Sequence, residues 1–587
     1  MIINKKKPGG SFGAKQRCGI QIFGGGGDDD EWGAPIFTGR KMKKGQTDYD
    51  LVKRWVRYCM EQHTASCRAA IPTNRTRFLE LSLRLIDVNR GCVVPVPHGG
   101  CRYFALSYVW GSVISLRLSK ANYTELSQPG ALSSAGADLP KTITDAIYFV
   151  RNLGETYLWV DSLCIIQDSL DDKAVQIPNM DIVYQSAVLT IVAAAGKDAN
   201  AGLPGARPWS RQSTQVIAKV QDMTLSNVQR PFHWGMPESA WSSRGWTFQE
   251  KVLSTRRLVF TDSQTYFECP GATWCEDMAQ EPFNAETHKI HQDGDMSTFP
   301  STDAASQSPF GRYGKLVEEY SMRNLSFEKD AIDAFSGILS MLQPKLDGTE
   351  YIFGLPECDL HTALLWNPQF GCPHVRRDKS KVPGEDATMD LDFPTWSWAG
   401  WQTHVDYRTA RAGGSLEGLT IPRTTLYMWM PDSQQLRRVG DKGTHGDQSK
   451  TLARQDSGAV FRQITSSGLP LDRAFLYFIT HSARFRGDDD PSEHQKDWFE
   501  PKLYRIRSAS GDEVAHMSLP TSWHKNHRAA EFVLLSRDMS DDWGPRMLNV
   551  LLVEWDGGQI GYRVGMTLIS EDHWNTAGPV EKLVCLG

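Results

Sequence analysis

At 587 residues, the chain has room for about four domains of roughly 150 residues each. Hydrophobic residues make up 40% of it and charged residues 23%, so it can bury a large core. Wholesale disorder, a collagen-like fibre and a coiled-coil rod are thereby excluded. The 64 basic and 69 acidic residues give a net charge of −5, which argues against a dedicated nucleic-acid binder.

The cysteines and the hydrophobic runs bear on the compartment of the protein. Its 11 cysteines are too few for a disulfide-rich secreted domain, and the closest pair, Cys269 and Cys275, lacks the spacing of a zinc knuckle. We therefore expect reduced, mostly structural thiols and no metal. No apolar stretch approaches the roughly 18 residues that span a bilayer, and no apolar segment of a signal peptide follows the N-terminal lysines. The sequence predicts a cytoplasmic protein without a membrane partner.

Residues 1–45 differ in composition from the rest of the chain. They hold 11 of the 50 glycines, and nine basic residues against four acidic ones. Such a segment offers little apolar area to a core, so we predict a flexible, Gly-rich basic arm. Residues 46–285 are expected to form the next domain. It begins with an amphipathic helix between Asp48 and Cys67, where apolar residues recur at helical spacing.

Three apolar runs alternate with two helical patterns inside this domain. The runs are Tyr103–Trp110, Tyr157–Asp161 with its apolar continuation to residue 166, and Ala187–Ala193. One helix follows Pro140, and a second is expected near Asp172–Gln185. Strands that are apolar throughout indicate parallel pairing with both faces covered. The sequence therefore predicts an α/β fold with a doubly wound parallel sheet as its core.

The pattern after residue 205 is looser. Further strands are expected at Arg257–Thr261 and Thr265–Cys269, and a helix at Lys329–Leu342. Residues 310–587 mix short apolar strands with polar loops and show no repeat. We expect them to form a mostly β or α+β module of unknown role.

The candidate site lies at the carboxyl ends of the predicted strands, where doubly wound sheets bind their ligands. No phosphate-binding loop, nucleophile elbow or zinc-protease motif is present, which leaves a carboxylate site. We predict Asp161, at a strand end, and Glu250, on a later helix, as the catalytic residues. Carboxylates there can stabilise an oxocarbenium-like transition state or bind ribose hydroxyls. The candidate substrate-binding residues are Ser107, Trp110, Arg244, Trp246 and Gln249.

Each of these residues also has a structural interpretation. Asp161 can cap its own loop, and Arg244 can form an ion pair with one of the carboxylates. The tryptophans can belong to the core, and Cys164, embedded in apolar neighbours, is expected to be an inert thiol. The sequence leaves these alternatives open.

Several segments between residues 103 and 250 follow one another in a characteristic order. They are Tyr103-Phe-Ala-Leu-Ser-Tyr-Val-Trp-Gly111, Leu139-Pro-Lys-Thr-Ile-Thr-Asp-Ala-Ile147, Leu158-Trp-Val-Asp-Ser-Leu-Cys-Ile-Ile-Gln-Asp168, Met180-Asp-Ile-Val-Tyr184, Ala187-Val-Leu-Thr-Ile-Val-Ala-Ala-Ala-Gly196, Gly202-Leu-Pro-Gly205 and Arg244-Gly-Trp-Thr-Phe-Gln-Glu250. Together they resemble the motifs of the fungal heterokaryon incompatibility (HET) domain. Residues 333–338 and 394–399 resemble stretches that are common downstream in such proteins.

The resemblance implies a fungal protein linked to non-self recognition and regulated cell death. It also implies a flavodoxin-like fold similar to Toll/interleukin-receptor (TIR) domains, some of which cleave NAD with a helix glutamate. The segment from Ser243 to Glu250 looks similar to the motif around that glutamate, although Thr247 stands where that motif has cysteine. NAD or a related nucleotide is thus a possible substrate, and no bound cofactor is expected. Whether the protein is an enzyme, or a non-catalytic adaptor that acts through self-association or with another incompatibility protein, is left open.

Overall fold

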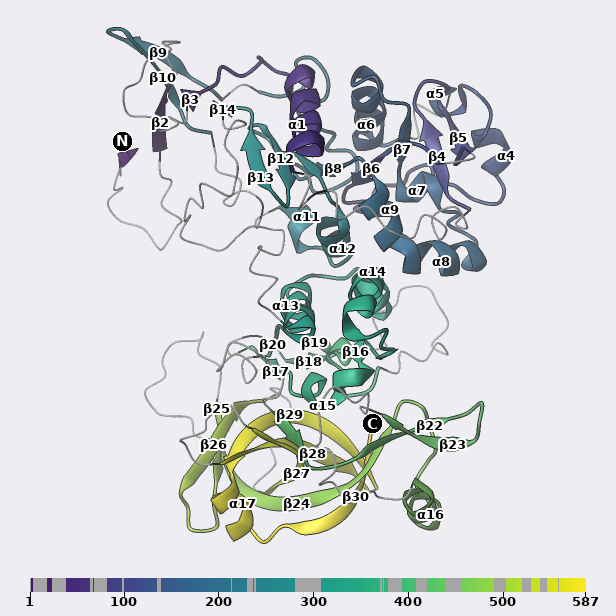
Figure 1. Ribbon diagram of the computed structural model, residues 1–587, viewed down its shortest axis with the longest axis vertical. Helices are drawn as coiled ribbons and strands as arrows, with labels where there is room; N and C mark the ends of the chain where they lie inside the picture. The colour runs from purple at the N-terminus through teal and green to yellow at the C-terminus, as the bar shows by residue number, and fades with distance from the viewer. Residues whose placement is uncertain are drawn as a thin grey trace. The chain divides into compact units, whose positions relative to one another are not determined.

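The computed structural model divides the chain into two compact units, Met1–Ser301 and Thr302–Gly587. Figure 1 labels the helices and strands of both units. The structure describes residues 2–3, 18–23, 38–63, 67, 82–97, 100–134, 139–212, 214–229, 236, 239–279, 308–369, 372, 374–377, 393–407, 420–439, 457–489, 503–519, 529–538, 546–557 and 559–587. Among these residues, no helix is long and apolar enough to cross a bilayer.

An eight-stranded mixed sheet forms the centre of the first unit (Figure 1). The four middle strands, β7, β6, β8 and β11, run parallel, and the strands outside them pair antiparallel. The prediction of an α/β fold is confirmed, and the three strands that were predicted to pair in parallel, β6, β7 and β8, do so. Antiparallel strands extend this core at both ends, so the whole sheet is mixed. The strands in spatial order are β13 (Ala272–Cys275), β12 (Thr265–Cys269), β11 (Arg257–Phe260), β8 (Leu189–Ala193), β6 (Phe104–Ser107), β7 (Tyr157–Trp159), β4 (Arg84–Asp87) and β5 (Cys92–Pro95).

Helices cover both faces of this sheet. Helices α1 (Tyr49–Gln62) and α6 (Lys141–Asn152) lie on one side, and α9 (Met180–Ser186) and α12 (Trp246–Leu253) lie on the other (Figure 1). Their apolar residues recur at helical spacing and are buried against the strands. Helix α6 ends before Gly154, whose φ of 80° suits the left-handed turn that stops a helix, as predicted.

Two predicted elements differ in the structure. The residues that were predicted to continue the strand β7 instead form a helical turn, α7 (Asp161–Cys164). The Cys164 N–H donates a hydrogen bond back to the Val160 carbonyl and closes this turn. The helix expected near residues 172–185 is divided into α8 (Leu170–Gln176) and α9. Pro178 lies between the two, and proline has no N–H for a helical hydrogen bond.

Part of the N-terminal arm belongs to a second, four-stranded sheet. Strand β2 (Cys18–Ile22) pairs antiparallel with β1 (Ile2–Ile3) and with β10 (Met223–Asn227), and β10 pairs with β9 (Ile217–Val220). A short strand, β3 (Thr38–Gly39), pairs with β14 (Met278–Ala279). Most of the remaining arm lies outside the described residues, and its flexibility stays a prediction.

A ten-stranded sheet dominates the second unit, so the prediction of a strand-rich C-terminal part is confirmed. Helices α13 (Pro309–Ser321), α14 (Asp333–Leu342) and α15 (Leu360–Ala363) precede the sheet, and α14 follows a 3₁₀ turn. Two further helices are α16 (Ser457–Ser466) and α17 (Glu571–Thr576). The sheet contains β21 (Thr420–Pro422), β22 (Leu426–Met430), β23 (Gln435–Val439), β24 (Leu476–Asp489), β25 (Leu503–Arg507), β26 (Glu513–Ser518), β27 (Ala529–Asp538), β28 (Met547–Asp556), β29 (Ile560–Ser570) and β30 (Val580–Leu586).

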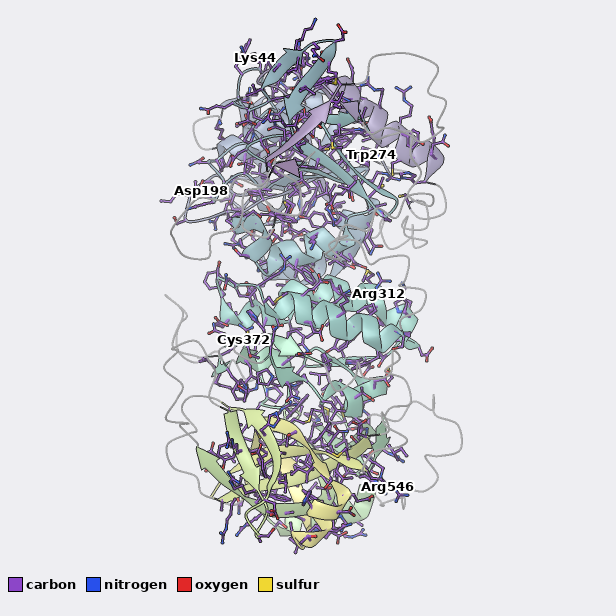
Figure 2. All side chains as sticks on the ribbon, turned by 90° about the vertical axis from the view of Figure 1, so that its left-hand side faces the viewer. Lys44, Asp198, Trp274, Arg312, Cys372 and Arg546 are labelled. Carbon is purple, nitrogen blue, oxygen red and sulfur yellow. The ribbon has the colours of Figure 1, made fainter. Side chains whose placement is uncertain are left out.

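Tryptophans fill much of the interior of the second unit. Trp366, Trp396 and Trp398 are fully buried. The Arg563 guanidinium lies 3.9 Å from the centre of the Trp366 ring and donates a 2.6 Å hydrogen bond to the Leu364 carbonyl. The side chains of the two units are drawn in Figure 2. The tryptophans within the segment 394–399 therefore serve packing.

Candidate functional site

Ser107 is the last residue of β6, at the point where the order of the parallel strands reverses. From β6 the chain passes through α6 to β7 on one side, and it then returns to β8 on the other side of β6. Such a switch point at the carboxyl ends of parallel strands is where open α/β sheets bind ligands. The Ser107 side chain is fully buried there.

Glu250 on α12 contacts Ser107, although 143 positions of sequence separate the two residues. The Ser107 hydroxyl donates a short hydrogen bond to the Glu250 carboxylate, and the Trp241 indole N–H donates to the Ser107 oxygen at 2.6 Å. Only 5% of Glu250 is exposed. The structure thus places this carboxylate inside the unit, against a strand end.

Asp161 follows the neighbouring strand β7, and its carboxylate is held by two donors. The Ser162 backbone N–H donates to Oδ1 at 2.6 Å, and the Trp110 indole N–H donates to Oδ2 at 2.9 Å. The Arg117 guanidinium lies 4.8 Å from the centre of the Trp110 ring. The loop-cap interpretation of Asp161 is therefore correct for one oxygen, while the second oxygen is held by a side chain from the end of β6.

The two carboxylates influence each other electrostatically. Burial raises the pKa of Glu250 to about 8, and the charge of Asp161 adds to the rise, against hydrogen bonds from Ser107 and Tyr184 and the charge of Arg244. Burial also raises the pKa of Asp161 to about 6, opposed by its bonds from Ser162 and Trp110. Near pH 7 the pair therefore retains about one proton, held mainly by Glu250. Two carboxyl groups with separated pKa values can serve as acid and base in one site.

The other predicted binding residues lie on or just before α12. Arg244 and Trp246 are half-buried, and Gln249 is fully buried one residue before Glu250. Arg244 is close enough for its charge to lower the pKa of Glu250. A substrate-binding role for these three residues stays a prediction.

Three aromatic residues of the site were missed by the sequence analysis. Trp241 donates to Ser107, the Tyr184 hydroxyl on α9 is close enough to lower the pKa of Glu250, and the Tyr108 hydroxyl lies 2.9 Å from that of Ser162. All three lie within or beside the HET-like segments, so their position in those segments was the available signal. Nothing in the local periodicity indicated that their polar atoms would face the polar groups of the site rather than an apolar core.

Cys164, beside this site, behaves as the sequence analysis expected. It is fully buried, and burial raises the pKa of its thiol to about 12. A thiol that is neutral and enclosed is a poor nucleophile.

Comparison with known proteins assigns the region that carries this site. Residues 103–250 match the family model described as "Heterokaryon incompatibility protein (HET)", so this part of the chain is a HET domain. The chain is similar to heterokaryon incompatibility protein 6, OR allele, of Neurospora crassa, with 29% identity over 100 residues. That match covers 15% of this chain and only 14% of the relative. No solved structure matches the chain.

Proposed function

We propose that the protein acts in fungal heterokaryon incompatibility, and that its HET domain promotes regulated cell death. The family match over residues 103–250 and the similarity to an incompatibility protein of Neurospora crassa support this role. The family match lies within the first unit. The proposal therefore assigns the effector to that unit and leaves the second unit for recognition or control.

We further propose that the core of the first unit is a doubly wound sheet of the flavodoxin and TIR type. The parallel strands have the spatial order β7, β6, β8, β11, which in chain order is second, first, third, fourth. This is the beginning of the flavodoxin-like order. Helices on both faces of the sheet support the same assignment (Figure 1).

The activity that we propose is cleavage of the glycosidic bond of NAD or a related nucleotide. The observation that carries it is the buried Ser107–Glu250 hydrogen bond at the switch point, beside a second carboxylate, Asp161. Cleavage of such a bond develops positive charge on the ribose, which a nearby carboxylate stabilises. A carboxylate pair sharing about one proton supplies both an anion and an acid at neutral pH.

The pKa directions suggest how the two carboxylates divide the work. Asp161, with a pKa of about 6, is largely ionised near pH 7 and is the better candidate to stabilise the ribosyl cation. Glu250, with a pKa of about 8, is largely protonated near pH 7 and can transfer its proton to a leaving group, which a glutamine at this position could not do. Trp110, which holds Asp161, would position that carboxylate.

A non-catalytic adaptor is the alternative, and one observation favours it. Strand β9 is the last strand of the four-stranded sheet among the described residues, and Val216, Ile217 and Val220 on or beside it are exposed. An exposed apolar edge strand is a surface on which another chain can pair. If the domain is an adaptor, it signals by self-association, and Glu250 has a structural role in the core instead of a catalytic one.

Induced expression of the full chain in a fungal host separates the two proposals when NAD and viability are followed together. If the domain is an NAD-cleaving enzyme, NAD falls before viability does. Glu250→Gln then abolishes both losses, whereas the exposed control Glu125→Gln abolishes neither. Equal amounts of folded protein are verified for each variant.

The adaptor predicts the opposite pattern. Cell death then persists in Glu250→Gln at unchanged NAD, and it is lost when Ile217→Lys and Val220→Lys charge the β9 edge. NAD loss that persists in Glu250→Gln would remove Glu250 from the mechanism.

A further inference from the structure

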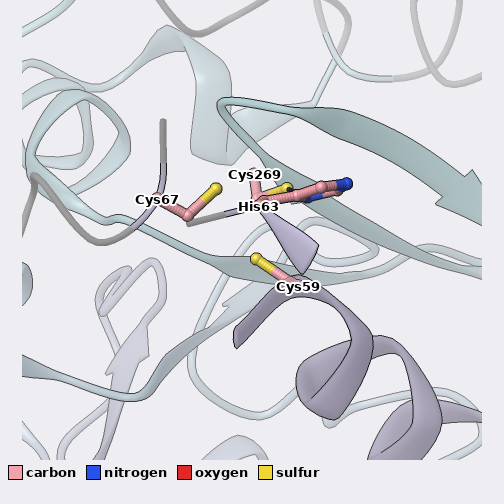
Figure 3. Close-up of side chains that lie close together, drawn as sticks. All are labelled: Cys59, His63, Cys67 and Cys269. Atoms are coloured by element: carbon pink, nitrogen blue, oxygen red, sulfur yellow. Dashed lines mark hydrogen bonds between the residues drawn. The ribbon is translucent and has the colours of Figure 1, made fainter. Parts of the chain in front are cut away.

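Four metal-ligating side chains converge in the first unit, away from the carboxylate site. The sulfur atoms of Cys59, Cys67 and Cys269 and a ring nitrogen of His63 all lie within 4.8 Å of one another. All four residues are buried, with His63 the most exposed at 8%. Figure 3 shows their side chains turned toward a common point. The sequence predicts scattered structural thiols and no metal, but the fold gathers three of the thiols around a histidine.

The chain brings these residues together from two places. Cys59, His63 and Cys67 are four positions apart, and backbone bonds follow that spacing. The His63 N–H donates to the Cys59 carbonyl at 3.1 Å, and the Cys67 N–H donates to the His63 carbonyl at 2.9 Å. Cys59 lies in the last turn of α1 and His63 is the residue that caps this helix, so the two backbone bonds place Cys59, His63 and Cys67 side by side. Cys269, the last residue of β12, completes the group.

The distances fit the edges of a tetrahedral metal site. Zinc binds cysteine sulfur at about 2.3 Å and histidine nitrogen at about 2.0–2.1 Å, so tetrahedral edges measure roughly 3.5–3.8 Å. His63 Nδ1 lies 3.3 Å from Cys269 Sγ, close to the expected sulfur–nitrogen edge. No two of the four ligand atoms are more than 4.8 Å apart, so no separation exceeds such an edge by more than roughly 1.3 Å.

The surroundings suit a metal with three thiolate ligands. Three cysteine thiolates, one neutral histidine and Zn²⁺ carry a net charge of −1, and three protons leave when the metal binds. The Arg256 guanidinium donates to Cys59 Sγ at 3.2 Å and places a positive charge beside the group. Hydrogen bonds from such neighbours commonly orient and stabilise metal ligands.

The histidine ring is fixed in place by its neighbours. It packs against Trp274, with 5.6 Å between ring centres, and meets the Tyr58 ring edge-on at 5.8 Å. Trp274 is labelled in Figure 2. A Cβ at Gly271 would lie 2.9 Å from His63 Nδ1, so glycine leaves the space that the ring occupies.

We propose that Cys59, His63, Cys67 and Cys269 form a structural zinc site of the Cys₃His type. Four protein ligands leave no coordination position for a substrate, and this distinguishes the site from a catalytic zinc centre. The metal joins the end of α1 to β12, so it secures the N-terminal helix on the antiparallel edge of the central sheet. This role is independent of the proposed NAD cleavage.

The test is the metal content of the full-length protein, purified without chelators and measured by mass spectrometry. We expect about one zinc per chain. Cys67→Ser and His63→Ala should lose it, whereas Cys92→Ser, which alters a buried thiol outside the group, should retain it. His63→Cys should also retain the metal, because four cysteines form an equally common zinc site.

Cobalt provides a second readout that does not depend on any variant folding. The wild-type chain, freed of its metal and given Co²⁺, should develop the intense visible bands of tetrahedral cobalt bound to thiolates. Those bands should change, without disappearing, in His63→Cys. A folded wild-type chain that contains no zinc and develops no such bands would overturn the proposal. So would a native disulfide between any two of the three cysteines, detected by non-reducing peptide mapping.

Discussion

Glu250 and Glu268 are both buried carboxylates of the first unit, yet their partners are different. Glu268 on β12 accepts a 3.1 Å hydrogen bond from Arg257 Nε at its Oε2, and Arg257 Nη2 lies 3.0 Å from the same oxygen, with both side chains almost completely enclosed. Glu250 instead accepts from the neutral hydroxyl of Ser107, and its pKa is raised by burial and by Asp161. The Arg257 guanidinium neutralises the negative charge of Glu268 inside the protein. Glu250, by contrast, retains a proton that a reaction can use.

The difference between the two glutamates teaches how to distinguish a structural carboxylate from a candidate catalytic one. Burial alone does not separate them, because both are enclosed. The partner does separate them: a guanidinium in an ion pair stabilises the charged form of the carboxylate, while a hydroxyl and a second carboxylate leave the proton available. Perturbed groups of the second kind cluster at functional sites.

The largest effect should follow from removing the cation of the structural pair. Arg257→Leu leaves Glu268 buried without its guanidinium, and we expect it to lower the free energy of unfolding by about 3–5 kcal/mol. Urea denaturation, with hydrogen exchange of the β11 and β12 peptides, measures the loss. The double variant Arg257→Leu, Glu268→Leu should recover most of it, since two apolar side chains replace the pair. A single variant as stable as wild type would make the pair irrelevant to the fold.

A smaller effect should appear in the pH dependence of stability. The pKa of Glu250 rises from 4.5 to about 8 on folding, so the folded chain holds this proton more tightly than the unfolded chain. The contribution is fully present below pH 4.5 and is lost as the pH rises toward 8. The decrease should be on the order of 1 kcal/mol per pH unit.

Glu250→Gln provides the matched measurement, because glutamine has no proton to lose. Urea denaturation at several pH values between 5 and 8 should show a decrease in wild type that is much reduced in the variant. Asp161→Asn, which removes the neighbouring charge, should shift the decrease to lower pH. Equal slopes in wild type and Glu250→Gln would contradict a raised pKa.

The smallest effect should come from the hydroxyl beside Glu250. Ser107→Ala removes the acceptor of the Trp241 N–H and the donor to Glu250, and we expect a stability loss of about 1–2 kcal/mol. The Ser107 bond lowers the pKa of Glu250, so its removal should move the pH-dependent decrease to higher pH. The control is Ser254→Ala, whose hydroxyl donates to the Glu250 backbone carbonyl. It should lose stability without that shift, and the same shift in both variants would argue against a direct contact.

Much of the local structure could be predicted from the sequence. The apolar run around β6, the helical spacing of α6 and the glycine after it are local signals, and each element formed where its signal lies. Two predicted elements were wrong, the single helix near residues 172–185 and the continuation of the strand beyond Asp161. Pro178 separated α8 from α9, and the backbone turned into α7 directly after β7 because its hydrogen bonds close a helical turn.

The candidate site was predictable only in part. Asp161 and Ser107 were identified because strand ends are recognisable in a sequence, and Glu250 because its segment resembles a known motif. The role of Trp241 as a donor to Ser107 had no local signal. The spacing of Cys59, His63 and Cys67 was not recognised as a metal-ligand pattern, and the fourth ligand, Cys269, lies 206 positions from His63.

The sequence by itself determined the order of the strands and helices in the HET domain and the residues at the strand ends. These features follow from periodicity and turn chemistry over a few neighbouring positions. Only the tertiary structure placed Glu250 on Ser107, 143 positions away, and Cys269 beside His63, 206 positions away. Such contacts depend on which strands become neighbours in the sheet, and no local pattern of residues encodes that choice.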